Sequence, residues 1–212
     1  HRLNALGYLA LHRLDPRFPH SGNAGQLDLI LALGWIRDNI AAFGGDPANI
    51  TLFGQSGGGA KIATLLSMPA ARGLFHRGWT MSGQQVTASG PLNATRRARA
   101  CLDRLGVTPA EAATLPLDRL LAALDTPDPI LGGRLYFGPV LDMANLPRHP
   151  FYPDADPAAL GIPLVLGNTR AETRAFFPAD KPPRQGLDWT NLAERLGPEL
   201  RVDIDPHWVV AQ

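Results

Sequence analysis

A lone serine among glycines, in residues 45–66 (GDPANITLFGQSGGGAKIATLL), limits the folds open to this chain more than any other feature. Residues 50–53 form a short apolar run, which is typical of a buried strand. Ile62 and Leu66 follow with helical spacing, so Ser56 lies where a strand turns directly into a helix. The chain therefore reverses its direction within very few residues, and the serine stands at the bend.

The residues around this bend fit the pattern G-x-S-x-G, with Gly54 and Gly58 on either side of Ser56. Glycines at these two positions leave room for a strained corner that pushes the serine oxygen out of the fold. Gly57, at the start of the helix, has a backbone N–H that can bind a developing oxyanion. A plain glycine-rich turn is the alternative, but the strand before and the helix after favour a nucleophile elbow.

Periodic apolar segments indicate the organisation of the rest of the chain. They predict strands near 50–53, 78–83 and 163–167, a helix that ends at Gly44–Gly45, a helix after Ser56, and a helical segment over 92–125 that contains a Thr108–Glu111 capping box. A proline-rich loop, 125–163, leads to the last strand. Strands that alternate with helices indicate an α/β fold with a parallel sheet, into which 92–125 is a helical insertion.

Composition excludes several classes of protein. The chain has 212 residues, of which 45% are hydrophobic and 18% charged, as in a globular domain rather than a disordered segment. A net charge of +1 without a basic face gives no support to a nucleic-acid partner. No apolar stretch reaches the roughly 18 residues that a membrane span needs. Cys101, the single cysteine, follows the apolar spacing of its helix and is expected in the core.

The segment FGGDPANITLFGQSGG, residues 43–58, resembles the serine signature of type B carboxylesterases. Further similarity lies upstream in HRLNALGYLAL and GNAGQLDLILALGWIRDNIAAFGGDP, and downstream in PAARGLFHRGWTMSG, GPVLDMANLPRHPF and PLVLGNTRAETRAFF, so that it covers most of residues 1–177. The resemblance implies an α/β-hydrolase fold, a parallel sheet with flanking helices. Residues 1–212 are then part of one such domain, with the elbow strand and helix at 50–68, the helical insertion at 92–125 and the acid-bearing strand and loop at 163–177.

The resemblance also implies the catalytic residues. Ser56 corresponds to the nucleophile and Gly57 to an oxyanion donor. Glu172 stands five residues beyond Gly167, the spacing at which the family carries its triad acid, which would orient a histidine. A solvated loop glutamate, paired with neighbouring arginines, is the alternative for Glu172.

The base of the triad is harder to assign. Only His207 follows Glu172, as the triad order requires, and DIDPHWVVAQ lacks the glycine and aromatic surroundings of the family's histidine. We expect His207 to be an ordinary surface histidine and the base to lie beyond Gln212. The family's glycine-rich oxyanion loop is expected before His1. The chain is thus interpreted as a fragment that lacks both ends and is nearly inert when isolated.

The function implied is hydrolysis of carboxylic esters through a Ser-His-Glu acyl-enzyme mechanism, without a cofactor or metal. A catalytically silent binding or adhesion module on the same fold is the alternative, and peptidase or thioesterase activity is a lesser variant. Retention of both Ser56 and Glu172 favours the enzyme. The partner is then a small-molecule ester. Gln55, where many relatives carry glutamate, disfavours a cationic choline-type ester unless it only braces the turn. Acyl and alcohol specificity, oligomeric state and a secreted or cytoplasmic location stay open.

Three structural expectations follow. Ser56 should have a strained backbone conformation. Glu172 should lie on the same rim of the sheet as Ser56, with a gap of about 6 to 9 Å between the side chains for one imidazole ring. The strand at 50–54 should be unpaired along one side, which makes the isolated chain hard to keep soluble.

Overall fold

The computed structural model describes residues 1–83, 88–172, 180, 184–196 and 205–211 of the chain. It divides into two compact units, residues 1–167 and residues 168–212. The sheet belongs to the first unit, and two short helices, α7 (Leu192–Leu196) and α8 (Pro206–Val210), belong to the second. The assignment of the whole chain to one domain stays a prediction. Among the described residues, every helix is too short or too polar to cross a membrane.

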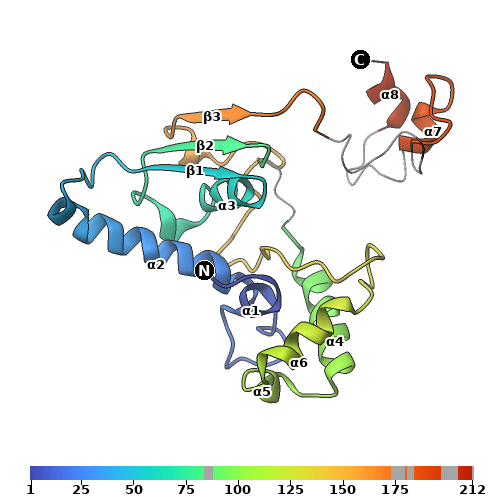
Figure 1. The fold of residues 1–212 in the computed structure, drawn as a ribbon, viewed down its shortest axis with the longest axis horizontal. Helices are drawn as coiled ribbons and strands as arrows, with labels where there is room; N and C mark the ends of the chain where they lie inside the picture. Colours follow the sequence, from blue (N-terminus) through green and yellow to red (C-terminus); the bar gives the residue numbers. More distant parts are fainter. Residues whose placement is uncertain (84–87, 173–179, 181–183, 197–204, 212) are drawn as a thin grey trace. The chain divides into compact units, whose positions relative to one another are not determined.

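Three parallel strands form the sheet, in the order β1 (Thr51–Gln55), β2 (Arg77–Met81) and β3 (Leu164–Gly167) (Figure 1). Helix α3 (Gly57–Leu65) connects β1 to β2 and, with the long helix α2 (Ala24–Asn39), lies on one side of the sheet. The predicted parallel α/β arrangement is confirmed.

The last residues of the three strands are aligned. Gln55 pairs with Met81, and Met81 pairs with Gly167. Two further backbone hydrogen bonds continue these ladders, from the N–H of Ser56 to the carbonyl of Met81 at 2.8 Å and from the N–H of Ser82 to the carbonyl of Gly167 at 2.6 Å. The chain therefore leaves all three strands at the same edge of the sheet, where ligands of open α/β sheets bind.

Strand β1 is an edge strand of the sheet that the described residues form, as expected. A row of apolar side chains also crosses the face opposite α3, because Phe53, Trp79 and Val165 are neighbours in register and are 75%, 47% and 58% exposed. An unpaired edge beside an exposed apolar face favours association with other chains.

A hydrophobic core fills the space between the sheet and its helices. Helix α2 continues into a 3-10 turn over Ile40–Phe43, and Gly44 ends it at φ 82°, as predicted. The buried members of this core are Leu33, Ile50, Leu65, Leu66, Met68, Ala71, Leu74, Phe75 and Leu146. Shorter helical turns are found at Ser21–Asn23, Pro69–Ala71, Ala123–Asp125 and Pro157–Ala159.

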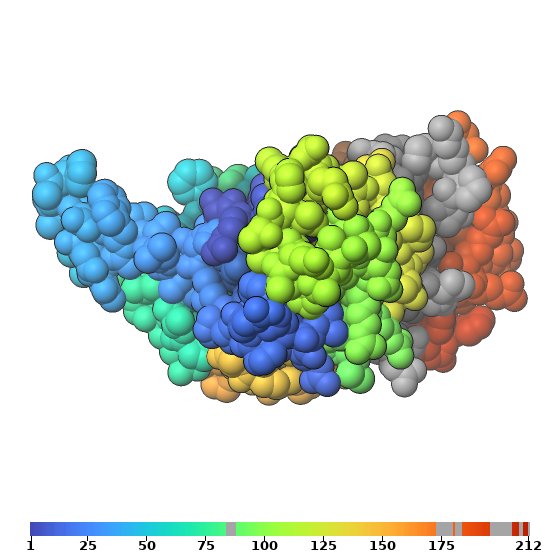
Figure 2. Space-filling model, turned by 90° about the horizontal axis from the view of Figure 1, so that it is seen from below, coloured from blue at the N-terminus to red at the C-terminus, as the bar shows by residue number. Residues whose placement is uncertain are grey.

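The inserted segment forms a separate core with the N-terminal residues. Its helices are α4 (Pro91–Leu105), α5 (Pro109–Ala112) and α6 (Leu117–Ala122). The N-terminal residues include the short helix α1 (Asn4–Tyr8). Figure 2 shows the blue N-terminal residues beside these yellow-green helices. The buried residues are Leu9, Leu11, Ala98, Cys101, Leu102, Leu105, Ala112, Leu120, Ala123 and Leu135.

Three predictions for this segment can be compared with the structure. The capping box between Thr108 and Glu111 is present. Cys101 is fully buried, and burial raises the pKa of its thiol to about 11, which fits a core residue. Helical spacing also predicts one packed face for Leu117, Leu120, Leu121 and Leu124, but this is wrong for Leu117 and Leu121, which are 54% and 49% exposed.

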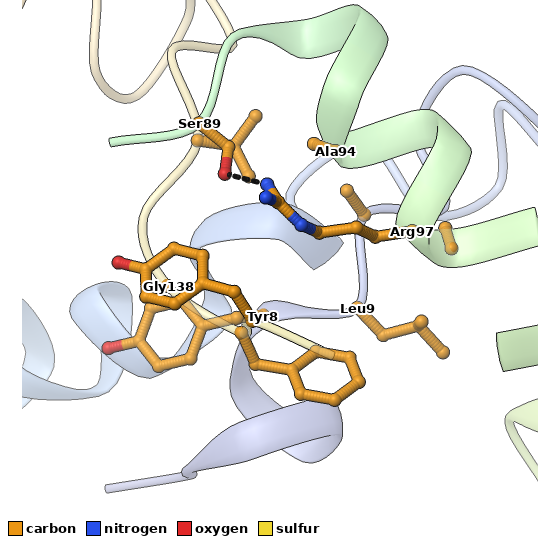
Figure 3. A pocket seen from close by; sticks show the side chains of 11 residues that line it. Tyr8, Leu9, Ser89, Ala94, Arg97 and Gly138 are labelled. Atoms are coloured by element: carbon orange, nitrogen blue, oxygen red, sulfur yellow. Dashed lines mark hydrogen bonds between the residues drawn. The ribbon is translucent and has the colours of Figure 1, made fainter. Parts of the chain in front are cut away.

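A buried ion pair holds α4 to the loop that follows the insertion. The Nε of Arg97 lies 2.6 Å from Oδ2 of Asp128, and the two side chains are 7% and 0% exposed. The guanidinium also donates to Oγ of Ser89 at 2.8 Å, and Figure 3 shows it reaching from α4 across a small pocket that Tyr8 also lines. The Asp128 carboxylate accepts three backbone N–H groups as well, those of Ile130, Leu131 and Tyr136.

We expect Asp128→Asn to lower the free energy of unfolding by about 3 to 5 kcal/mol, because it leaves the Arg97 charge buried without its partner. Urea unfolding followed by circular dichroism measures this. Asp125→Asn is the matched control, since Asp125 pairs with Arg134 at 3.1 Å between side chains that are 71% and 82% exposed. That variant should lower the free energy of unfolding by about 1 kcal/mol or less.

The pH dependence provides a second check. Burial by itself raises the pKa of the Asp128 carboxyl, but the hydrogen bonds from Arg97 and the backbone outweigh it and lower the pKa from 3.8 to about 2. The contribution to stability is therefore present above about pH 4 and is lost as the pH falls through about 2. A stability difference between wild type and Asp128→Asn that stayed constant down to pH 2 would contradict this assignment.

Candidate active site

Ser56 occupies the turn between β1 and α3. Its backbone has φ 52° and ψ −123°, a conformation that non-glycine residues rarely adopt, so the expected strain is confirmed. The turn is held from both sides. The N–H of Ser56 donates to Met81 of β2, and its carbonyl accepts the N–H of Ala60 at 3.1 Å within α3. The serine side chain stands exposed at the carboxyl edge of the sheet.

Glycines pack closely around this turn, though not at every position that the motif predicts. A Cβ on Gly54 would lie 2.5 Å from the carbonyl carbon of Gly58, so a side chain there is excluded. A Cβ on Gly83, the second residue after β2, would lie 2.0 Å from the carbonyl oxygen of Ser56, and one on Gly59 would meet Gly83 at 3.0 Å. A Cβ on Gly58 itself meets nothing within 4 Å, so the expected need for room at Gly58 is wrong.

Gly83→Ala is therefore expected to distort the Ser56 turn, whereas Gly58→Ala should leave it intact. The first change forces backbone against backbone and should cost about 1 to 3 kcal/mol in unfolding free energy and at least about tenfold in ester hydrolysis. The second places alanine in the first turn of a helix, where it is better than glycine by up to about 1 kcal/mol. Thermal unfolding and kcat/KM measured on both variants test this. Equal effects would show that the close approach at Gly83 is unimportant.

Gly57 is exposed and is the first residue of α3. Its N–H has no acceptor within the helix, and among the described residues it donates to no other backbone carbonyl. The positive end of the helix dipole adds to the attraction for an anion at this point. Gly57 is thus suitable as an oxyanion donor directly beside the Ser56 hydroxyl.

Glu172 follows β3 in the second unit of the chain. It is half-buried in a turn, and the backbone N–H of Thr169 donates to its Oε1, so its own loop positions one carboxylate oxygen. The strand that precedes it ends at Gly167, in register with the end of β1. The expected gap between the side chains of Ser56 and Glu172 stays a prediction.

The positions of two histidines, His76 and His207, bear on the assignment of the base. His76 accepts the N–H of Ile50 at 3.1 Å through Nδ1, which places it at the start of β1. Ser56 follows the other end of that strand, and five strand residues span about 16 Å. His76 therefore cannot accept the proton of the Ser56 hydroxyl directly. His207 is exposed in the first turn of α8, where its N–H donates to Asp205 at 2.9 Å.

Two other polar residues, Gln55 and Ser82, lie near the elbow. Gln55 is exposed, and within the described part of the chain its side chain makes no hydrogen bond, so bracing of the turn by Gln55 is not supported. Ser82, directly after β2, also has a positive φ of 53°. The edge of the sheet thus carries two serines in strained conformations, Ser56 and Ser82.

Sequence reasoning did not single out Lys61, the one charged residue of α3. Its Nζ would lie 3.9 Å from a Cβ placed on Gly57, and it lies 6.0 Å from the ring centre of Tyr8. The side chain is partly buried, and burial lowers the pKa of its ammonium. The only signal in the sequence is a lysine within an otherwise apolar and glycine-rich helix.

Comparison with known proteins agrees with this geometry. The model of the carboxylesterase family matches residues 1–194. Para-nitrobenzyl esterase of Bacillus subtilis is 41% identical over 188 residues, which are 85% of this chain and 37% of that protein. Phenmedipham hydrolase of Pseudarthrobacter oxydans is 38% identical over 188 residues, with 85% and 36% covered. The chain thus spans somewhat more than a third of the length of these relatives.

Solved structures give the same result for the fold. The crystal structure of carboxylesterase EST55 of Geobacillus stearothermophilus superposes with a TM-score of 0.77 and 36% sequence identity, over 95% of this chain and 42% of that one. Because sequence and fold agree over nearly all of its residues, this chain belongs to the carboxylesterase family and has the α/β-hydrolase fold of that family's solved members.

Proposed function

We propose that the protein containing this chain hydrolyses carboxylic esters, with Ser56 as the nucleophile. The observation that carries the proposal is the backbone of Ser56, whose positive φ holds an exposed hydroxyl at the carboxyl edge of a parallel sheet. The next N–H, that of Gly57, donates to no backbone carbonyl among the described residues. Strain of this kind persists only where the surrounding structure enforces it, and it is concentrated at functional sites.

The proposed reaction follows from these positions. Oγ of Ser56 attacks the ester carbonyl while a histidine, oriented by Glu172, accepts the hydroxyl proton. The N–H of Gly57 donates to the oxygen that becomes negative in the tetrahedral intermediate. Collapse of the intermediate breaks the bond to the alcohol, which leaves with the proton from the histidine. Water, activated by the same histidine, then releases the acid and restores Ser56.

A silent binding module on the same fold is less well supported. Such a module needs neither a strained serine nor a carboxylate five residues beyond a strand that ends in register with the elbow strand. Gly54 and Gly83 leave the space that the strained turn at Ser56 needs. Backbone strain lowers stability, and a module that only binds gains nothing from it.

The substrate class proposed is a small-molecule ester. The relatives compared above are named for para-nitrobenzyl esters and for phenmedipham, which are different compounds. Acyl-transfer machinery does not fix the leaving group, so the acyl and alcohol parts must be set by the surrounding side chains.

Labelling with diethyl 4-nitrophenyl phosphate tests the proposal in the protein translated from the whole reading frame. Attack by Oγ on phosphorus expels one 4-nitrophenolate per molecule and leaves a diethyl phosphoryl group, which peptide mass spectrometry should locate on Ser56. Ser82→Ala is the matched control, because Ser82 is also a serine at positive φ on this edge. Labelling should be lost in Ser56→Ala and kept in Ser82→Ala. A label on Ser82, or none on Ser56, would contradict the proposed nucleophile.

A further inference from the structure

Lys61 carries a positive charge in a place where lysine is unfavourable. It lies in the second turn of α3, and helical side chains lean toward the helix N-terminus, so its ammonium stands beside Gly57, at the positive end of the helix dipole. A surface lysine normally extends into water, but this one is partly buried. The position therefore costs both desolvation and repulsion from the helix end.

Nothing in the described part of the chain balances this charge. The ammonium of Lys61 forms no hydrogen bond and no ion pair there, although the backbone carbonyl of Lys61 accepts a hydrogen bond from Nε2 of Gln26 at 3.2 Å. Burial alone accounts for the lowered pKa of the ammonium. Among the described residues, its ammonium lies 6.0 Å from the ring centre of Tyr8, which is the outer limit of a cation–π interaction. A half-buried cation of this kind is balanced when an anion binds beside it.

We propose that Lys61 binds an anionic group of the substrate, so that the protein prefers esters that carry a carboxylate near the scissile bond. The inference rests on the proposed function, since it places the substrate beside Ser56 and Gly57. Lys61 and the Gly57 N–H then act on different charges. The N–H faces the negative oxygen that develops during the reaction, whereas Lys61 attracts a charge that the substrate already has.

Matched pairs of esters test the preference. 4-Nitrophenyl hydrogen adipate and 4-nitrophenyl methyl adipate differ by one carboxylate in the acyl part. 4-Acetoxybenzoate and its methyl ester differ in the alcohol part. The quantity measured is the ratio of kcat/KM for the anionic ester to kcat/KM for the neutral one. Lys61→Met should lower this ratio about tenfold in at least one pair, because a charge pair in a partly buried site is weakly screened. The pair affected shows which part of the substrate carries the carboxylate.

Lys61→Arg keeps the charge and should keep most of the preference. Arg104→Met is the matched control for loss of one positive charge, because Arg104 is exposed at the end of α4. It should leave the ratio unchanged. An unchanged ratio for Lys61→Met in both pairs, or an equal change in Arg104→Met, would overturn the inference while Ser56-dependent hydrolysis of the neutral esters still supported the proposed function.

Binding measured without turnover separates the two proposals further. N-Methyl adipamate and 4-acetamidobenzoate carry an amide in place of the scissile ester of the two anionic substrates, and at least one of them should bind wild type about ten times more tightly than Lys61→Met in calorimetry. Equal binding of both amides by the two proteins would overturn the role of Lys61, even if hydrolysis proved independent of Ser56 and the proposed function failed. Thermal unfolding of each variant shows that the protein compared is folded.

Discussion

Replacement of Ser56 by alanine is expected to lower kcat for 4-nitrophenyl butyrate by a factor of about 10⁴ to 10⁶ in the protein translated from the whole reading frame. Alanine removes the only atom that can form the acyl-enzyme. The oxyanion donor and the substrate contacts stay, and they account for the residual rate above that in water. Release of 4-nitrophenolate, followed by absorbance, measures the effect.

The size of this loss separates a nucleophile from a serine that only shapes the turn. Ser82→Ala changes the other strained serine on the edge and should reduce kcat far less, by about tenfold or less. A Ser56→Ala protein that retained a tenth of the wild-type activity would leave the elbow without a catalytic role.

Glu172→Gln is expected to lower kcat by about 10² to 10⁴, because the amide keeps the size of the side chain but no longer stabilises the imidazolium. In wild type, kcat/KM should rise with a histidine-like ionisation near pH 6 to 7, since only neutral imidazole accepts the serine proton. The pH profiles of wild type and variant, compared at saturating and low substrate, measure both effects.

The alternative for Glu172, a solvated loop glutamate, predicts a different result. Glu194→Gln serves as the control, because Glu194 is exposed in α7, in the same unit of the chain. If Glu172→Gln changed kcat as little as Glu194→Gln, the triad assignment of Glu172 would be wrong.

The local structure around Ser56 could be predicted from sequence because each part of it follows from short-range rules. An apolar run, a glycine at either end of the bend and helical spacing afterwards were enough to predict a strand, a turn and a helix. The same holds for the ending of α2 at Gly44 and for the Thr108 capping box.

Contacts between distant segments could not be predicted in this way. The close approach of Gly83 to Ser56 depends on the pairing of β1 with β2, and the motif instead pointed to Gly58. Lys61 becomes a candidate binding residue only through its position beside Gly57 and Tyr8, which the sequence does not reveal. Leu117 and Leu121 fit a helical stripe, yet neighbouring segments cover only part of α6. Each of these features is set by the partner across the contact rather than by the residue's own neighbours in sequence.

The spacing of the strands along the chain has a consequence for the order of folding. Paired residues of β1 and β2, such as Thr51 and Arg77, are much closer in sequence than Gly78 and Leu164, which pair β2 with β3. Closing the longer loop costs about 1 kcal/mol more in chain entropy. The serine's turn can therefore assemble early, from one compact β-α-β unit, whereas the strand that precedes Glu172 joins only after the insertion has folded back. A newly made chain should hold Ser56, the proposed nucleophile, in place before Glu172, the proposed acid, arrives.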